Sequence, residues 1–209
     1  MFYLVTGPAP AASKWHMATL IPDRILIQQV VEGNTAAFAL LIARHQQFAF
    51  HIAYKLLRHR QRAEEATQDA FVKAYRQLVA FRGEAQFSTW LYRIVYTTAV
   101  SHARRRQLPT TSLDDDNAPV DCVVDDARNQ LQTLAYHDQK QYLEAALATL
   151  APNETLLISL FYQHEHSVAE IGEITGLSKA NIKVKLLRTR RKLYAVLHQL
   201  LKHEIADLL

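Results

Sequence analysis

The sequence predicts an all-α protein with two small helical domains joined by an acidic flexible linker. Glycine and proline are scarce, at five and six of 209 residues, and 49% of the chain is hydrophobic. Apolar residues recur at helical spacing, and we find no alternating β-branched run typical of a strand. The net charge is +7 over residues 21–107, −6 over 108–138 and +2 over 139–209. We therefore expect an N-terminal extension without regular structure at 1–20, helical domains at 21–107 and 139–209, and a linker at 108–138.

Four helices are expected in the first domain. Asp23 is placed to cap a short helix that ends near Gly33, and Asn34 to cap a longer one. The third helix begins at about Arg62, after the break at "RHRQR". Its inward-facing positions are Phe71, Tyr75 and Leu78.

The fourth helix follows the loop "FRGEAQFS", in which Gly83 ends the preceding helix and Ser88 is placed as a cap. It extends to the arginine cluster at 104–106. Its inward-facing positions are Leu91, Ile94, Val95 and Thr98. Four helices of this size form a self-sufficient bundle.

The second domain ends in a helix-turn-helix pattern. Helical spacing resumes at "QKQYLEAALATL", and Pro152 suits the first turn of a helix that extends through Phe161. Ser167 and Glu170 form a capping box, Gly176 closes the helix, and Ser178 caps the next one. The apolar stripe of that last helix is Ile182, Leu186, Leu193 and Leu197.

Seven cations with no acid among them follow Ser178. They are Lys179, Lys183, Lys185, Arg188, Arg190, Arg191 and Lys192. In helix-turn-helix motifs the second helix lies in the DNA major groove, so this pattern favours DNA binding. The alternative is a solvated helix whose basic residues interact with its dipole.

Several classes of function find no support in the sequence. It has no glycine-rich phosphate loop, metal-ligand spacing or nucleophile elbow, which argues against an enzyme and predicts no cofactor. Cys122 is the only cysteine, so the chain has no internal disulfide. His164 and His166 lie in an expected exposed turn without further clustered ligands, so we expect no metal. The apolar runs are too short to span a membrane and the start lacks a signal-peptide pattern, which predicts a cytoplasmic protein without membrane insertion.

Two long motifs give the chain a specific resemblance. "AEEATQDAFVKAY" and "FRGEAQFSTWLYRI", within residues 63–99, resemble region 2 of bacterial sigma factors of the sigma-70 family, the extracytoplasmic-function (ECF) group in particular. The second domain resembles region 4, and two regions joined by an acidic linker is the layout of that group. Thr97 departs from the pattern, because the group often has Asn there. Thr offers a shorter hydroxyl in place of an amide that both donates and accepts.

The resemblance implies a transcription initiation factor. Such a protein binds the clamp helices and flap of core RNA polymerase, directs it to promoter DNA and helps melt it, and an anti-sigma factor is a further partner of many relatives. By position, the polymerase contact falls on Gln68, Asp69 and Phe71. The single-stranded −10 contact falls on Arg82, Phe87, Trp90, Arg93, Tyr96 and Thr97. The −35 duplex contact falls on Ser178, Lys179, Asn181, Lys183, Lys185, Arg188, Arg190 and Arg191.

Elementary chemistry agrees with these roles but leaves alternatives. Cations and aromatic faces suit single-stranded DNA, and the loop before Trp90 can form a pocket for an unstacked base. For Trp90 the prevalence of large aromatic side chains in cores favours a core position over a pocket wall, and Phe71 can equally pack the bundle. On the last helix, Asn181 and Lys183 are candidates for base edges, and Asn181 can instead support the Ser178 cap.

Two alternative interpretations of the function of the whole chain are considered beside the sigma factor. A stand-alone helix-turn-helix regulator with a helical sensor domain would explain the end of the sequence but not the motifs at 63–99. A helical enzyme would need a pocket that the sequence does not indicate.

Overall fold

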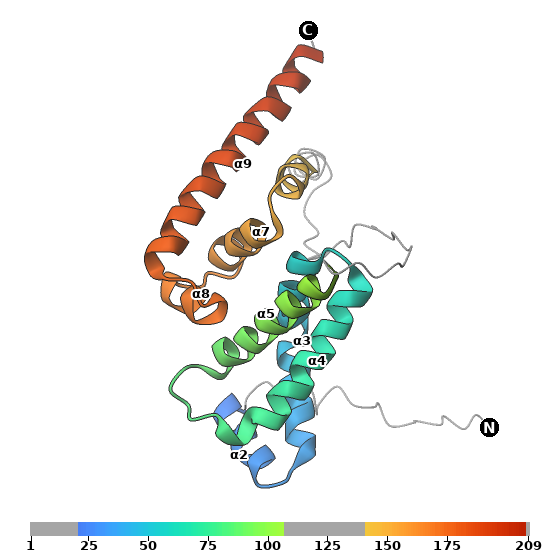
Figure 1. The fold of residues 1–209 in the computed structure, drawn as a ribbon, viewed down its shortest axis with the longest axis vertical. Coiled ribbons are helices and arrows are strands. Elements are labelled where there is room, and N and C mark those ends of the chain that lie inside the picture. Colours follow the sequence, from blue (N-terminus) through green and yellow to red (C-terminus); the bar gives the residue numbers. More distant parts are fainter. Residues whose placement is uncertain (1–20, 107–140, 208–209) are drawn as a thin grey trace, which may run out of the picture.

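The structure, a computed structural model, describes residues 21–106 and 141–207. Within these ranges every regular element is a helix, which confirms the all-α prediction. The N-terminal extension and the linker, with Cys122, lie outside the described residues. Figure 1 shows two groups of helices, which we call the N-terminal bundle (residues 21–106) and the C-terminal unit (residues 141–207).

The elements follow in chain order. The N-terminal bundle contains α2 (Asp23–Val31), α3 (Thr35–Leu57), α4 (Arg60–Gln77), the 3₁₀ turn η1 (Leu78–Ala80) and α5 (Phe87–Arg106). The C-terminal unit contains a helix through residues 141–148, α7 (Pro152–Ile158), the π-helical turn η2 (Ser159–Gln163), α8 (Val168–Thr175) and α9 (Lys179–Asp207).

The observed starts of the bundle helices agree with only one of the three predicted N-caps. Asn34 caps α3, since its Oδ1 accepts from the Ala36 N–H at 3.1 Å. Asp23 is not a cap: Pro22 precedes α2, and the Asp23 carboxylate instead pairs with two side chains of α3. Ser88 is not a cap either, because α5 already begins at Phe87. Helix α4 begins at Arg60, two residues before the predicted start.

A stripe of alanines lets α4 pack closely into the bundle. Ala63, Ala66, Ala70 and Ala74 recur at helical spacing and are fully buried. Large aliphatic residues of the neighbouring helices fill the rest of this core, each contributing about 1.5–3 kcal/mol on burial. They include Leu26, Leu41, Ile52, Leu91 and Val95.

The predicted inward positions of α4 are only partly correct. Phe71 and Leu78 are buried, as expected. Tyr75 is 43% exposed, because the alanine stripe takes the inner side of α4 and leaves this ring at its edge, in edge-on contact with Phe38 at 4.9 Å.

The helix-turn-helix forms as predicted. Ser167 Oγ accepts from the Glu170 N–H at 3.2 Å, and the Glu170 carboxylate accepts from the Ser167 N–H at 2.8 Å. Gly176 ends α8 with φ +74°, which glycine adopts without steric cost. Ser178 Oγ accepts from the Asn181 N–H at 3.3 Å at the start of α9.

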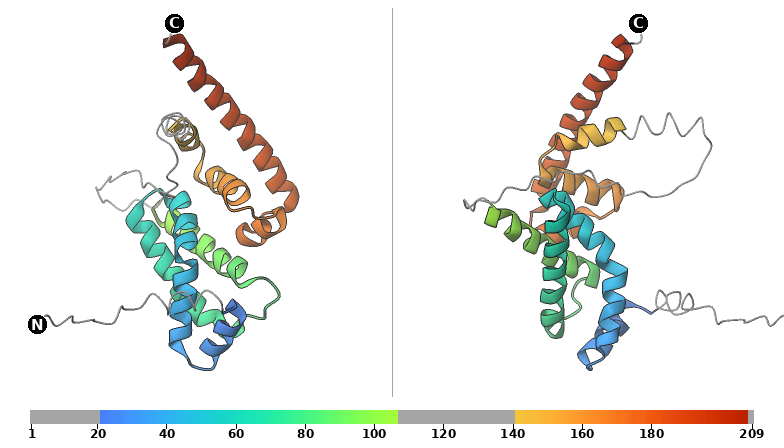
Figure 2. Two further views of the ribbon diagram at one scale, coloured as in Figure 1. Left: turned by 180° about the vertical axis from the view of Figure 1, so that it is seen from behind. Right: turned by 90° about the vertical axis from the view of Figure 1, so that its right-hand side faces the viewer.

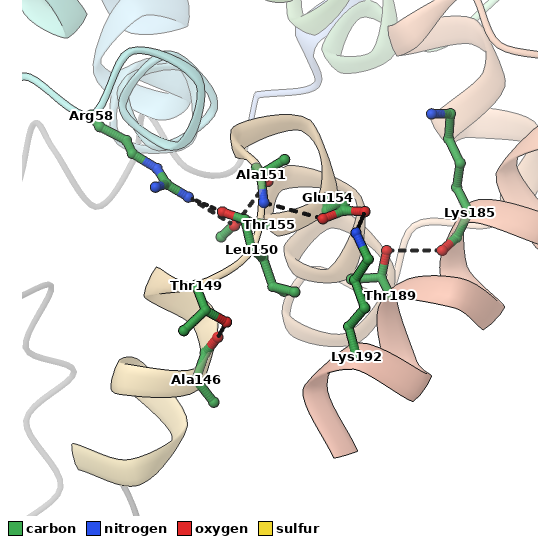
Figure 3. A network of polar contacts seen from close by, with 10 residues as sticks. All are labelled: Arg58, Ala146, Thr149, Leu150, Ala151, Glu154, Thr155, Lys185, Thr189 and Lys192. Atoms are coloured by element: carbon green, nitrogen blue, oxygen red, sulfur yellow. Dashed lines mark hydrogen bonds and ion pairs between the residues drawn. The ribbon is translucent and has the colours of Figure 1, made fainter. Parts of the chain in front are cut away.

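The two groups of helices pack against each other. Helix α5 lies beside α8, and α3 lies beside α7, as the views of Figure 2 also show. At the end of α3, Arg58 has left-handed backbone (φ +50°) and its guanidinium donates to the Leu150 carbonyl of the C-terminal unit (Figure 3). A histidine of α3, His51, contacts Ser159 of η2 at 2.8 Å.

Candidate nucleic-acid interface

The outer face of α4 presents polar and apolar side chains together. Gln68 and Asp69 are exposed, as a contact surface requires, and Asp69 Oδ2 lies 3.0 Å from His102 Nε2 of α5. Val72 on the same helix is 50% exposed, and Val79 on the 3₁₀ turn η1 that follows it is 78% exposed. These two valines belong to no motif that marks a contact surface in the sequence. The signal that marks them is the alanine stripe, which already accounts for the inner side of α4.

Phe71 does not share this outer face. Its side chain is buried, and its ring packs edge-on against Phe38 at 6.5 Å between centroids. Of the two roles open for this residue, the structure shows the packing role. Phe71 therefore supports the outer face of α4 from within the core.

A cavity of about 500 Å³ lies under the loop between η1 and α5. It is lined by Asp23, Arg24, Ile27, Arg44, Phe81, Gly83, Ala85, Gln86, Phe87 and Ser88. The loop before Trp90 thus borders a cavity, with Phe87 in its wall. Its arginines and phenylalanines are groups that suit a phosphate and a base.

Trp90 lies behind this loop in an aromatic group. Its ring is half-buried, with centroids 5.1 Å from Phe81 and 5.7 Å from Phe87. It therefore packs the loop against α5 and remains partly accessible. Arg82 is exposed on the loop itself.

A polar network that the sequence did not predict connects the cavity to α5. The Asp23 carboxylate pairs with Arg44 and lies 2.9 Å from His45 Nε2, and His45 Nδ1 lies 3.0 Å from the Tyr92 hydroxyl. Burial alone would raise the pKa of Asp23, but the hydrogen bond and charge of His45, together with Arg44, lower it below its usual value. Burial, with the nearby Asp23 charge, raises the pKa of Tyr92 to about 12. No sequence signal links these residues, because three separate helices bring them together.

The remaining predicted residues of α5 lie on two sides of the helix. Arg93 and Thr97 are exposed. The Thr97 hydroxyl donates within its own helix, at 2.9 Å from the Arg93 carbonyl, so only its acceptor lone pairs face outward. Tyr96 is half-buried and lines a cavity of about 80 Å³ between the bundle and the C-terminal unit, where burial raises its pKa.

Helix α9 presents most of its cations to the outside. The exposed ones are Lys179, Lys183, Arg188, Arg190, Arg191 and Lys192, and Asn181 is exposed beside them. Ile182 and Leu186 are buried and hold the helix to α8. Lys185 is half-buried and lines the same 80 Å³ cavity as Tyr96.

One cation of α9 has a structural partner. Lys192 Nζ lies 2.6 Å from the Glu154 carboxylate of α7 (Figure 3). The hydrogen bond from Lys192 is the largest effect on the pKa of Glu154 and lowers it. Burial opposes this shift, and the hydrogen bond from the Ala151 N–H adds to it. Lys192 therefore ties α9 to α7.

Two negative findings concern the described part of the chain. Its His, Cys, Asp and Glu side chains do not gather in groups of three that would suit a metal ion. None of its helices is both long and apolar enough to cross a membrane.

The fold defines a two-domain helical protein: a helical bundle followed by a unit that ends in a helix-turn-helix. Residues 41–108 match the family model for Sigma-70 region 2, and residues 140–193 match that for Sigma-70, region 4. The chain belongs to the sigma-70 family, within its ECF group. It is a transcription initiation factor that binds RNA polymerase and directs it to promoters.

The chain aligns with individual relatives over nearly their whole lengths. RNA polymerase sigma-H factor of Pseudomonas aeruginosa is 26% identical over 191 residues, which cover 89% of this chain and 99% of the relative. ECF RNA polymerase sigma-E factor of Haemophilus influenzae is 28% identical over 181 residues, covering 83% and 94%. The match of region 2 to the first domain argues against a stand-alone regulator with a sensor domain.

Solved structures share the fold. CnrH, in complex with the cytosolic domain of CnrY, superposes with a TM-score of 0.58 at 24% identity and covers 85% of this chain and 97% of that one. The sigma factor RpoE of Bartonella quintana, in complex with the anti-sigma factor NepR, gives a TM-score of 0.55 at 21% identity, covering 77% and 96%.

Proposed function

We propose that residues 21–107 bind the polymerase clamp helices and the melted −10 element, and that residues 139–209 bind the flap and the −35 duplex. The linker at 108–138 joins the two. The observation that carries this division is the cavity of about 500 Å³ on the bundle, together with the exposed cations of α9. One surface suits an unstacked base, and the other suits duplex DNA.

The polymerase contact lies on the outer face of α4. Gln68 and Asp69 supply polar groups there. The exposed Val72, with Val79 on the adjoining η1, supplies the apolar area that protein interfaces bury. Phe71 contributes by fixing α4 in the bundle. This combination of polar and apolar groups is what a protein partner, rather than DNA, would use.

The −10 contact uses the loop and the exposed side of α5. An unstacked base enters the cavity beside Phe87, while Arg82 and Arg93 meet phosphates. Trp90 and Tyr96 offer aromatic faces for neighbouring bases. Thr97 accepts hydrogen bonds from the strand, because its own proton is engaged within the helix.

The −35 contact uses the start of α9. Residues early in a recognition helix meet base edges, and later cations meet phosphate. Asn181 and Lys183 read bases, whereas Ser178, Lys179, Arg188, Arg190 and Arg191 position the helix. Lys185 lies at the inner edge of this surface and reaches DNA once α9 is separated from α5.

Three further proposals follow from family membership. The protein acts in the cytoplasm, where polymerase is found, it is not an enzyme, and it binds an anti-sigma factor, as RpoE binds NepR. A pull-down from a lysate of the source bacterium would test the last of these.

Run-off transcription tests the proposed function directly. Core polymerase alone should give no specific transcript from genomic fragments, and adding this protein should give discrete ones. Permanganate reactivity of thymines near −10 should appear only with both present. Specific footprints by this protein in the absence of polymerase, without any transcript, would favour the stand-alone regulator.

A further inference from the structure

Histidines line the contact between the N-terminal bundle and the C-terminal unit. His51 of α3 lies 2.8 Å from the hydroxyl of Ser159 on η2, and its ring is 4.9 Å from that of His164. The rings of His164 and His166 lie 4.1 Å and 5.5 Å from Phe48 of α3. Three imidazoles from two separate parts of the chain therefore meet around one phenylalanine.

The hydrogen bonds fix the neutral tautomer of His51. Ser159 has one hydroxyl proton, which it donates to Gln163 Oε1 at 2.6 Å. His51 Nε2 must therefore donate to Ser159 Oγ, and the free lone pair is on Nδ1. A second proton would be added to Nδ1, within a half-buried contact.

Few groups near this contact could compensate that charge. The titratable and charged groups around it in the described residues are Lys55 on α3, Arg58 directly after α3, Tyr92 on α5, Glu170 on α8 and the exposed Glu165 between His164 and His166. Lys55 repels a charge on His51 and His164, whereas Glu170 favours one on His166. Tyr92 is neutral here, with its pKa raised to about 12.

We propose that His51, His164 and His166 form a proton-sensitive latch that holds the two helical units closed while the imidazoles are neutral and releases them when the imidazoles are protonated. His51 carries most of the effect, because it is half-buried and hydrogen-bonded across the contact. His164 is more exposed, so solvent screens its charge.

The closed arrangement covers part of the DNA-binding surface, a step that rests on the proposed function. Tyr96 of α5 and Lys185 of α9 line one small cavity with Leu156 and Leu157 of α7. Neither residue can reach DNA fully while the units are packed together. Opening the latch therefore regulates access to both the −10 and the −35 surfaces.

The sign of the pH dependence follows from the direction of the shifts. Burial, followed by repulsion from Lys55 and His164, lowers the pKa of His51 to about 4 in the closed form. Burial also lowers the pKa of His164 and His166. In the open form these groups titrate near about 6.5, so protons favour opening between about pH 6.5 and 4. For His51 alone, the open-to-closed ratio should rise about tenfold from about pH 7 to about pH 5.5.

Single-molecule energy transfer on the full chain would measure the open fraction. Dyes are attached to cysteines that replace two exposed residues, Gln77 on α4 and Gln199 on α9. Cys122→Ser removes the native thiol beforehand. His51→Gln keeps a donor for Ser159 but cannot be protonated, and His51→Arg is always charged. His102→Gln is the matched control, because this histidine bonds Asp69 away from the latch.

We expect the open-to-closed ratio to rise about tenfold as the pH falls from about 7 to about 5.5 in the wild type and in His102→Gln. His51→Gln should lose most of this rise, and His51→Arg should be open at neutral pH. Circular dichroism at each pH checks that the helices persist. An unchanged rise in His51→Gln, or a closed His51→Arg at neutral pH, would overturn the latch.

Binding of a fluorescent single-stranded −10 oligonucleotide by polymerase holoenzyme tests the proposed role of α5 separately from the latch. If the free protein opens on acidification but Tyr96→Ala holoenzyme binds the oligonucleotide normally, the latch stands and the proposed role of α5 is wrong. If acid does not open the protein and Tyr96→Ala weakens binding, the latch is wrong and the proposed role stands.

Discussion

Replacing single cations of α9 should separate base reading from phosphate binding. Arg191→Ala removes an exposed charge late in the recognition helix, and Lys183→Ala removes one near its start. Lys192→Ala is the matched control, since Lys192 is already paired with Glu154 at 2.6 Å. All three variants lose one positive charge, so any difference among them reports position rather than net charge.

The magnitudes follow from the number of phosphates each variant leaves unneutralised. One phosphate contact contributes about 0.9 to the slope of log affinity against log salt. A fourfold rise in salt, from about 50 to about 200 mM, should therefore weaken wild-type binding about 3.5-fold more than that of Arg191→Ala. Lys183→Ala should lose about 1–3 kcal/mol on the preferred −35 sequence and little on variants already mismatched there. Lys192→Ala should keep the wild-type salt slope.

The assay is binding of holoenzyme to a panel of −35 duplex variants at several salt concentrations. Melting of the isolated protein checks that Lys192→Ala has loosened α9 from α7 without unfolding it. If Lys183→Ala lowers affinity for every duplex equally and keeps their ranking, Lys183 is a phosphate contact. A salt slope that falls as much in Lys192→Ala as in Arg191→Ala would refute the assignment of Lys192 to the structural pair.

Three other predictions test the bundle. Asp69→Ala should weaken binding to core polymerase at least several-fold while helicity is kept, and normal co-purification would contradict the assignment; His102→Ala, which removes only the neighbour of Asp69, should bind nearly normally. Tyr96→Ala should reduce permanganate reactivity near −10 more than closed-complex formation, because stacking contributes about 1–3 kcal/mol per base; unchanged thymine reactivity would exclude this role. Asp23→Asn should lower the free energy of unfolding at neutral pH by roughly 1–3 kcal/mol, since the amide removes the negative charge and leaves one accepting oxygen where the carboxylate offers two, one to Arg44 and one to His45. Because the pKa of Asp23 is lowered in the folded protein, its contribution should be present above about pH 4 and be lost as the pH falls further, so wild type and variant should converge in acid; equal stability at neutral pH would show that the pair contributes nothing.

Short-range sequence signals predicted the local structure well. The Ser167–Glu170 capping box, the Gly176 turn and the Asn34 cap each depend on residues within four positions of one another, and all three formed. Such features can be recognised from sequence because the interacting groups are fixed by helical geometry alone.

Contacts between distant helices were not predictable in the same way. Asp23 looks like a cap from its neighbours, but Arg44 and His45 of α3 take its carboxylate. Tyr75 looks inward by spacing, but alanines occupy the inner side of α4. The same limit applies to the candidate site: the sequence indicated the loop before Trp90, but not the polar network behind the cavity.

Arg58 has a consequence for any effort to make this protein more heat-resistant. A non-glycine residue with φ +50° carries a strain of about 1–3 kcal/mol, which glycine would relieve. Yet the Arg58 side chain also donates to the Leu150 carbonyl and so fastens the C-terminal unit to the end of α3. Arg58→Gly would thus raise the melting temperature of the bundle while increasing the radius of gyration of the whole chain. A screen that selects only for thermal tolerance would favour this substitution. Because such a screen does not measure the contact between the two helical units, it would yield a protein in which they separate more readily.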